Sequence, residues 1–108
     1  MKFTLYHNKN CSKSRACLLL LEERKIDFFL RDYLREPLKK NEIVKIIDNL
    51  LGNKMDLLRK VEKNISEKNL ADHIFRDQKN LQRPIFFDGK NFIICRPPDK
   101  VLDHLEDL

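Results

Sequence analysis

Residues 3–15, with the sequence FTLYHNKNCSKSR, are predicted to form a strand that leads into a helix, with a cysteine at the junction. Phe3 and Leu5 alternate with polar residues, which is typical of a half-buried strand. Apolar residues are dense over 16–21, and the charged run 22–25 ends the pattern. That pattern predicts a helix of about three turns. Cys11 therefore lies at or beside the first turn of this helix.

The position of Cys11 favours the ionised form of its side chain. Free main-chain N–H groups and the positive end of the helix dipole stabilise an anion over a neutral thiol at this place. The thiolate is also the reactive form of cysteine. A buried packing cysteine is the alternative, but the polar neighbours Asn10 and Ser12 argue against it. Cys11 is the candidate nucleophile.

The composition limits the class of protein. The chain has 108 residues, of which 42% are hydrophobic, with only two glycines and four prolines. These values predict one globular domain, residues 1–108. No segment has the length of a membrane span and the first residues lack a signal-peptide pattern, so we expect a cytoplasmic protein with no membrane partner. The three irregularly spaced cysteines do not form a disulfide framework and are expected to be free thiols.

The formal net charge of +5 does not by itself predict a nucleic-acid partner. Lysine and arginine are interspersed with acidic residues along the whole chain, and the few aromatic residues do not alternate with basic ones. Nucleic-acid binding is therefore not expected. A small anionic substrate or a negatively charged partner protein fits the charge balance, and we expect a monomer.

The middle of the chain predicts a second strand followed by helices. Residues 26–32 are the second strand, and a strand, helix and strand in succession predict a parallel pair. Isoleucines and leucines recur at helical spacing over 43–51, and Gly52 is the expected C-terminal cap. A shorter amphipathic piece is expected to place Met55, Leu58 and Val61 on one side. Only short helical turns are expected over the polar residues 62–82.

The last third of the chain predicts a hairpin and a helix. Two apolar runs, 84–87 and 92–95, flank an Asp-Gly turn signal, so a β-hairpin is expected. A proline pair at 97–98 ends the second strand and can open a helix. The apolar stripe of this helix is Val101, Leu102, Leu105 and Leu108. The predicted order is β-α-β, helices, β-β-α.

Four short motifs support a more specific interpretation. They are Tyr6-His7-Asn8 followed by Cys11-Ser12-Lys13-Ser14-Arg15, then Leu57-Leu58-Arg59-Lys60, then Arg83-Pro84-Ile85, and last Cys95-Arg96-Pro97-Pro98 with Val101-Leu102. Together they resemble the glutaredoxin-coupled arsenate reductase (ArsC) family, especially its short arsenate-reductase-like branch, over nearly the whole chain. The element order also resembles the thioredoxin-like fold. The resemblance implies an α/β class with a mixed sheet flanked by helices, a helical insertion at about 38–82, and a cis peptide bond before Pro84.

The resemblance also implies an activity and a site. In the ArsC family a single cysteine attacks arsenate and three arginines hold the oxyanion. The matching positions are Cys11 as the nucleophile and an arginine cradle of Arg59, Arg83 and Arg96. Guanidinium groups suit such an anion because they offer paired donors. No bound cofactor is implied; glutathione is the implied co-substrate and glutaredoxin the implied partner.

Further residues at the implied site have simpler explanations as well. The family's motif histidine, thought to favour the thiolate, corresponds to His7, which can equally end a strand. Pro84, Ser14 and Arg15 are implied to have structural roles at the site. Ser14 also fits ordinary hydrogen bonding at a helix N-terminus, and an exposed helical charge explains Arg15 equally well. The other two cysteines, Cys17 and Cys95, are explained by packing.

The spacing of cysteines, arginines and glycines excludes several other kinds of site. A Cys-x-x-Cys dithiol is missing because position 14 is serine, so an external thiol is implied. The cysteine–arginine spacing of a phosphatase loop, zinc-ligand spacing and a glycine-rich phosphate loop are also missing. The alternative in another functional class is a non-arsenate thiol-redox protein, or a regulatory binding protein similar to the Spx transcriptional regulators. The cradle arginines favour the reductase.

One departure from the family pattern precedes Arg83. The family normally has an additional helix between the positions of Asp72 and Arg83, whereas only the short polar segment 73–82 is present here. This shortening keeps the regulatory alternative open. The placement of Arg83 and Pro84 relative to Cys11 depends on this segment, and a looser cradle would weaken substrate binding and activity.

Overall fold

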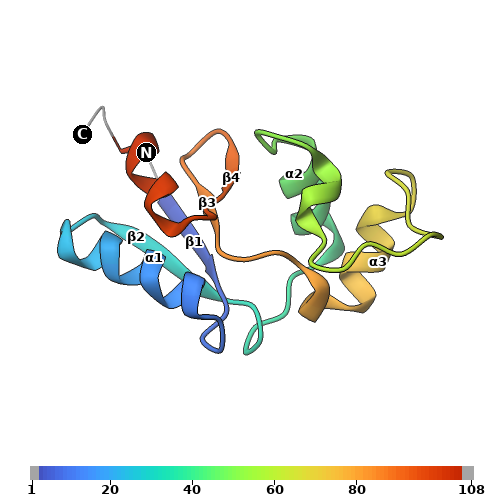
Figure 1. Ribbon diagram of the computed structural model, residues 1–108, viewed down its shortest axis with the longest axis horizontal. Coiled ribbons are helices and arrows are strands. Elements are labelled where there is room, and N and C mark those ends of the chain that lie inside the picture. Colours follow the sequence, from blue (N-terminus) through green and yellow to red (C-terminus); the bar gives the residue numbers. More distant parts are fainter. Residues whose placement is uncertain (1–2, 106–108) are drawn as a thin grey trace.

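The structure is a computed structural model that describes residues 3–105. Its centre is a four-stranded sheet with the order β2-β1-β3-β4 (Figure 1). The strands are β1 (Phe3–His7), β2 (Phe28–Asp32), β3 (Ile85–Phe87) and β4 (Phe92–Ile94). Strand β1 pairs in parallel with β2 and antiparallel with β3, which pairs antiparallel with β4. The predicted mixed sheet and element order are therefore confirmed.

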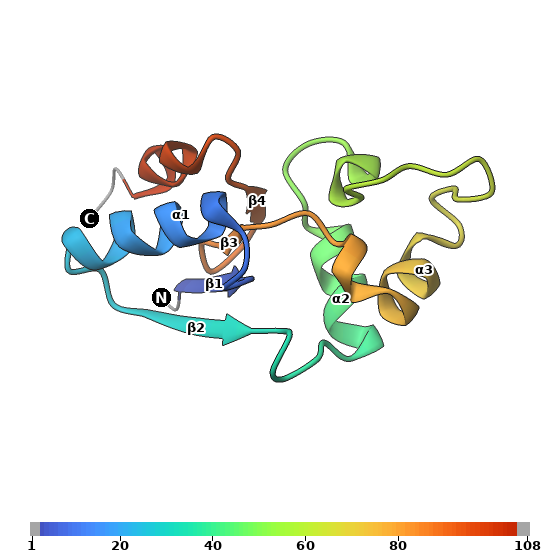
Figure 2. The same cartoon turned by 60° about the horizontal axis from the view of Figure 1, so that its bottom comes forward.

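One face of the sheet is covered by α1 (Ser12–Glu23) and the 3-10 helix η3 (Pro98–His104), which lie on the same side of it (Figure 2). Alternate residues of the strands point to this face, as the period of a strand requires. The core on this side consists of Phe3, Leu5, Cys17, Leu21, Phe86, Ile93, Cys95, Val101 and Leu105. Leu102 packs against this core only partly buried, and Leu108 lies outside the described residues. This packing directs the N-terminus of α1 toward the end of β1.

The other helices lie together at one end of the molecule (Figures 1 and 2). They are α2 (Lys40–Asp48), the 3-10 turn η1 (Lys54–Leu57), α3 (Leu70–Arg76) and the 3-10 turn η2 (Gln78–Asn80). Ile43, Ile46 and Ile47 form the buried stripe of α2, as the periodicity predicts. Their core continues to the second face of the sheet through Ile85 and Phe92. Over residues 3–105 no helix has both the length and the apolar character needed to cross a membrane.

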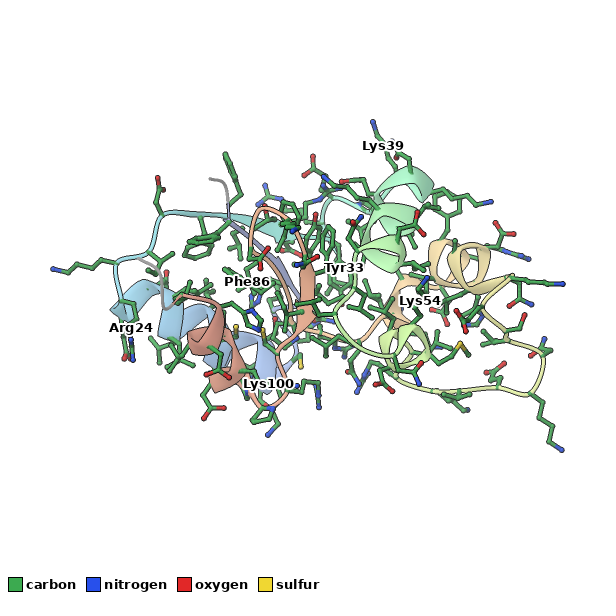
Figure 3. The ribbon with its side chains drawn as sticks, turned by 90° about the horizontal axis from the view of Figure 1, so that it is seen from above. Arg24, Tyr33, Lys39, Lys54, Phe86 and Lys100 are labelled. Carbon is green, nitrogen blue, oxygen red and sulfur yellow. The ribbon has the colours of Figure 1, made fainter. Side chains whose placement is uncertain are left out.

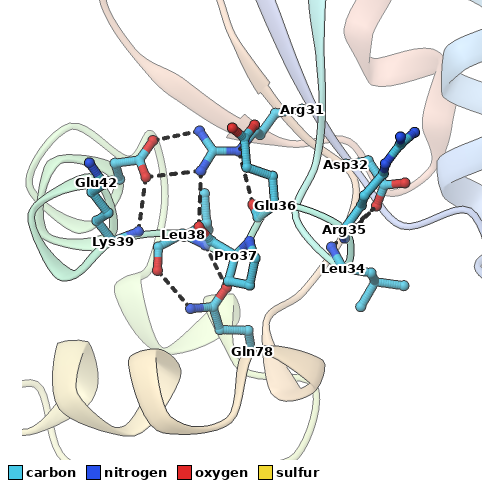
Figure 4. A network of polar contacts seen from close by, with 10 residues as sticks. All are labelled: Arg31, Asp32, Leu34, Arg35, Glu36, Pro37, Leu38, Lys39, Glu42 and Gln78. Atoms are coloured by element: carbon cyan, nitrogen blue, oxygen red, sulfur yellow. Dashed lines mark hydrogen bonds and ion pairs between the residues drawn. The ribbon is translucent and has the colours of Figure 1, made fainter.

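A polar network joins β2 to α2 (Figure 4). The Arg31 guanidinium donates to both carboxylate oxygens of Glu42, at 2.7 and 3.0 Å, and to the carbonyls of Glu36 and Pro37, each at 3.1 Å. The Gln78 side chain accepts from the N–H of Leu38 and donates to its carbonyl, both at 2.8 Å. The connection from β2 to α2 is therefore held in one conformation from both sides.

The predicted hairpin and cis peptide bond are both present. The Asp88 carboxylate accepts from the N–H groups of Lys90 at 2.9 Å and Asn91 at 2.7 Å, and Gly89 between them has a φ of 100°, which favours glycine. The bond between Arg83 and Pro84 is cis, and so is the bond before Pro97.

Two predictions about helix extent are wrong. Helix α2 ends at Asp48 rather than near Gly52, because the main chain beyond it pairs with β4. The Leu51 N–H donates to the Phe92 carbonyl, and the Phe92 N–H donates to the Asn49 carbonyl, each at 2.9 Å. Leu51 is exposed instead of facing the core.

The predicted amphipathic piece around Met55 is also shorter than expected, since η1 ends at Leu57. Leu58 forms an isolated bridge with Leu81, and Val61 is exposed. The chain leaves the helical conformation here because its main chain pairs with the segment that precedes Arg83. That segment contains the expected short helical turns, α3 and η2.

Candidate active site

Cys11 is the N-cap residue of α1, in the short loop that follows β1. Its N–H donates to the Asn8 carbonyl at 3.0 Å, which closes the loop between strand and helix. The side chain is half-buried and makes no capping hydrogen bond. The first turn of α1 contains no acidic residue. No carboxylate of this turn therefore competes with an anion for its free N–H groups.

The surroundings of Cys11 favour the thiolate. Burial acts to raise the pKa of the thiol, but the Ser14 N–H, the Arg83 side chain and the Lys13 N–H favour the anion, so the pKa lies below its usual range. The two N–H groups belong to the first turn of α1, and the guanidinium comes from a distant part of the chain. The predicted activation of Cys11 thus has a local and a tertiary source.

Arg96 lies directly beside the sulfur. Its Nη1 atom is 3.9 Å from Cys11 Sγ and donates to the Arg83 carbonyl at 2.9 Å. The residue follows β4 and precedes the cis bond to Pro97. One guanidinium therefore connects the reactive sulfur with the segment that enters β3.

Arg83 is nearly buried, with 9% of its surface exposed. Its Nη1 atom donates to the Lys79 carbonyl at 2.9 Å, so η2 orients the side chain. Its Nε–H is buried and has no hydrogen-bond partner among the described residues. An unpaired guanidinium N–H beside a cysteine sulfur is a ready donor for an anion. The segment before Arg83, which contains the end of α3 and all of η2, therefore brings this residue to Cys11.

His7 does not contact Cys11 through any hydrogen bond between described residues. Its Nδ1 atom lies 2.6 Å from Ser14 Oγ, which also accepts from the Asn8 N–H at 3.0 Å. Burial lowers the pKa of His7, and the nearby Asp32 carboxylate only partly offsets this. The imidazole is thus neutral near pH 7 and fixes the buried Ser14 in the first turn of α1.

Arg15 and Arg59 make hydrogen bonds to main-chain carbonyls away from the sulfur. The Arg15 Nη1 atom donates to the Lys9 carbonyl at 2.8 Å, so this exposed side chain braces the loop before Cys11. Arg59 is exposed, and its N–H donates to the Asn80 carbonyl at 2.9 Å. The structure therefore brings Arg83 and Arg96 to the thiol, whereas no hydrogen bond among the described residues joins the exposed Arg59 to it.

Tyr33 lies at the same edge of the sheet as the end of β1, although none of the four motifs contains it. It follows the last residue of β2, Asp32, which pairs with His7 at the end of β1. The carboxyl ends of parallel strands meet at one edge of a sheet, and ligands of open α/β sheets bind beyond such ends. Its position one residue beyond the second strand was the signal that could have identified it.

The sequence is similar to a known protein family and to proteins of that family in other organisms. The sequence profile of the ArsC family matches residues 6–104. An arsenate reductase of Haemophilus influenzae is 30% identical over 116 aligned positions, which cover 97% of this chain and 100% of the relative. An arsenate reductase of Escherichia coli is 32% identical over 96% of this chain and 81% of its own length.

A solved structure shows which fold this chain shares. The structure of an arsenate reductase from Vibrio cholerae superposes with a TM-score of 0.83 and 28% identity, over 95% of this chain and 97% of that one. The fold is therefore thioredoxin-like, as the order of the elements suggested.

Proposed function

The chain belongs to the ArsC family, and we propose that it reduces arsenate to arsenite at Cys11, with glutathione and glutaredoxin as the electron source. One observation supports this most directly. The Cys11 sulfur lies between the N-terminus of α1 and two arginines, and the buried Nε–H of Arg83 is unpaired. A tetrahedral oxyanion at this place would meet positive charge on both sides and supply the missing acceptor.

Arg83 and Arg96 are the proposed inner ligands of the oxyanion. Both are oriented by main-chain carbonyls before any ligand arrives, so little reorganisation is needed on binding. Arg59 is the third member of the proposed cradle and would close from the rim, where its exposed side chain is free to move toward the anion.

The proposed reaction uses two thiols for one arsenate. The Cys11 thiolate attacks arsenic and one oxygen leaves as water, which gives a Cys–S–As(V) adduct. The glutathione thiol then attacks the Cys11 sulfur, the sulfur–arsenic bond breaks, and its electron pair reduces arsenic to As(III). Arsenite leaves and a Cys11–glutathione disulfide remains. Glutaredoxin removes the glutathione by thiol–disulfide exchange and restores Cys11. This cycle needs reduced thiols, so the cytoplasm is the proposed location.

A groove lined in part by Arg96 is the proposed binding place of glutathione. It has a volume of about 380 Å³, and its lining includes Met55, Asp56, Gln82, Arg96 and Lys100. Besides Arg96, which is assigned to the oxyanion, the lining has one ammonium group, that of Lys100, and one carboxylate, that of Asp56. These can pair with a carboxylate and with the ammonium group of glutathione. We expect Lys100→Glu to raise KM for glutathione and to leave KM for arsenate unchanged.

The direct test is arsenate-dependent oxidation of NADPH with glutathione, glutaredoxin and glutathione reductase. Wild type should show turnover that disappears without arsenate, and Cys11→Ser should show none. Absence of any arsenate-dependent rate in folded wild type would refute the reductase and leave the thiol-redox or regulatory alternative.

A further inference from the structure

Tyr33 has an unsatisfied hydroxyl in the interior of the protein. Only 1% of the residue is exposed, and its hydroxyl has no hydrogen-bond partner among the described residues. Folded proteins rarely leave a buried hydroxyl unpaired, because it loses its bonds to water and gains none in return. A phenylalanine would fill the same space without that cost. We therefore expect the hydrogen-bond partner of this hydroxyl to be a bound ligand.

The position of Tyr33 points to the oxyanion site. Tyr33 follows the residue that pairs with His7, and the loop from β1 to Cys11 starts one residue after His7. Figure 3 shows Tyr33 where the sheet meets the helical end of the molecule. The phenol lies within electrostatic range of Cys11, Arg83 and Arg59. The second unpaired buried donor of the structure, the Arg83 Nε–H, belongs to the same group of residues.

The loop that contains Tyr33 is held in place on both sides. The Asp32 carboxylate accepts from the N–H groups of Leu34 at 3.2 Å and Arg35 at 3.3 Å. The Arg31 guanidinium donates to the carbonyls of Glu36 and Pro37, which follow in the chain, as Figure 4 shows. Tyr33 thus cannot easily turn away to find water, and its hydroxyl is preorganised.

We propose that Tyr33 is an additional oxyanion-binding residue, whose hydroxyl donates a hydrogen bond to one oxygen of a tetrahedral oxyanion beside the Arg83 Nε–H. This inference rests on the oxyanion site of the proposed function and adds a neutral donor to the charged ones. An arsenate oxygen that is not turned toward the guanidinium groups would receive this bond.

The electrostatics keep Tyr33 in the state that a donor requires. Burial raises the pKa of the phenol, and the Cys11 thiolate adds to this effect. The Asn8 amide, Arg83 and Arg59 act in the opposite direction without reversing it. The Asn8 amide acts on the phenol oxygen as a donor, so the Tyr33 O–H itself still lacks an acceptor among the described residues. The hydroxyl is therefore protonated at neutral pH and brings no negative charge to the anion.

The test compares Tyr33→Phe with wild type in two measurements on the reduced protein. Calorimetric titration with inorganic phosphate and with arsenate, both without glutathione, measures binding separately from turnover. Thermal unfolding without any oxyanion measures the stability of the empty site. We expect about a tenfold or greater rise in Kd, since the lost bond is to a charged acceptor. We also expect no loss of Tm in the empty protein.

Tyr6→Phe is the matched control, because the chain has two tyrosines and the charged groups near Tyr6 are Glu42 and Arg31 instead of the arginines beside Cys11. It should leave Kd unchanged. In turnover, Tyr33→Phe should raise KM for arsenate and leave KM for glutathione as it is.

The outcomes separate this inference from the proposed function. Equal Kd values for Tyr33→Phe and wild type, or a lower Tm for the empty variant, would overturn the role of Tyr33 and leave the reductase untouched. Tyr33-dependent phosphate binding in a protein without arsenate turnover would support the oxyanion donor and refute the reductase. Absence of oxyanion binding by wild type would overturn the inference as well.

Discussion

Arg96 donates to the main-chain carbonyl of Arg83 at 2.9 Å through the same Nη1 atom that lies 3.9 Å from Cys11 Sγ. The two arginines are thirteen positions apart. Arg83 precedes β3, and Arg96 follows β4. A single guanidinium group therefore links the Cys11 sulfur to the start of β3.

Replacement of Arg96 by lysine should reduce arsenate turnover although the charge is retained. A lysine ammonium on a shorter, flexible side chain cannot reproduce the two directed contacts of the guanidinium. We expect kcat/KM for arsenate to fall about tenfold or more, which corresponds to the loss of one charged hydrogen bond of about 1.5–3 kcal/mol. Steady-state kinetics measure this, and Arg24→Lys, an exposed replacement at the end of α1, serves as the control. Equal loss in both variants would contradict the specific role of Arg96.

The thiol of Cys11 should ionise below the ordinary cysteine value of about 8.5. The rate of alkylation as a function of pH reports this pKa, and Cys11→Ser identifies the signal. In Arg83→Gln the pKa should move back up, because the guanidinium is one of the groups that favour the thiolate. A titration of wild type at the ordinary value would contradict both the local and the tertiary source of activation.

Only one of the three cysteines should react rapidly in the native protein. Cys17 and Cys95 are fully buried, whereas Cys11 is partly exposed. The hydrogen bond to Cys17 and burial raise the pKa of Cys95 far above its usual range, so it remains a neutral thiol. Titration with a chromogenic disulfide should give one fast thiol before unfolding and all three after it. A second fast thiol in folded protein would show that the core around α1 opens readily.

The ion pair of Arg31 and Glu42 should make part of the stability depend on pH. Burial acts to raise the pKa of Glu42, but the hydrogen bond and charge of Arg31 and the Lys39 N–H outweigh it, so the pKa is lowered on folding. The unfolded chain then binds more protons than the folded one. The contribution is present above the unfolded pKa of about 4.3 and is lost as the pH falls through the folded pKa.

The variant that tests this is Glu42→Gln. We expect it to be less stable than wild type at pH 7 by about 1 kcal/mol, since both side chains are only partly buried. The difference should shrink in urea unfolding experiments at acidic pH. Glu67→Gln, at an exposed position outside this network, should show no such trend. A difference that stays constant with pH would mean that packing, and not charge, is responsible.

The sequence predicted the elements that depend on local pattern. The isoleucines of α2 and the Asp-Gly turn of the hairpin specify their structures within a few residues, and both predictions are confirmed. The end of α2 was predicted wrongly because Leu51 N–H bonds to Phe92, which is far along the chain. A cap signal at Gly52 does not reveal a competing strand.

The residues of the candidate site also differ in how far the local sequence predicts them. Cys11 at the start of a helix was predictable from its neighbours alone, whereas Arg83 and Arg96 were assigned only through the family resemblance. The contact of His7 with Ser14 instead of Cys11, and the unpaired hydroxyl of Tyr33, depend on tertiary positions that no local pattern encodes. An unpaired donor in particular has no sequence signature, because it is defined by what surrounds it.

Arg83 and Arg96 are both anchored on carbonyl oxygens, those of Lys79 and Arg83. Every amino acid supplies such an oxygen, so side-chain replacement at position 79 should be nearly silent. A one-residue insertion or deletion between 79 and 83 should instead rotate the anchor away and disable the site. The placement of both guanidinium groups thus depends on the course of the main chain between 79 and 83 and not on the side chain at position 79.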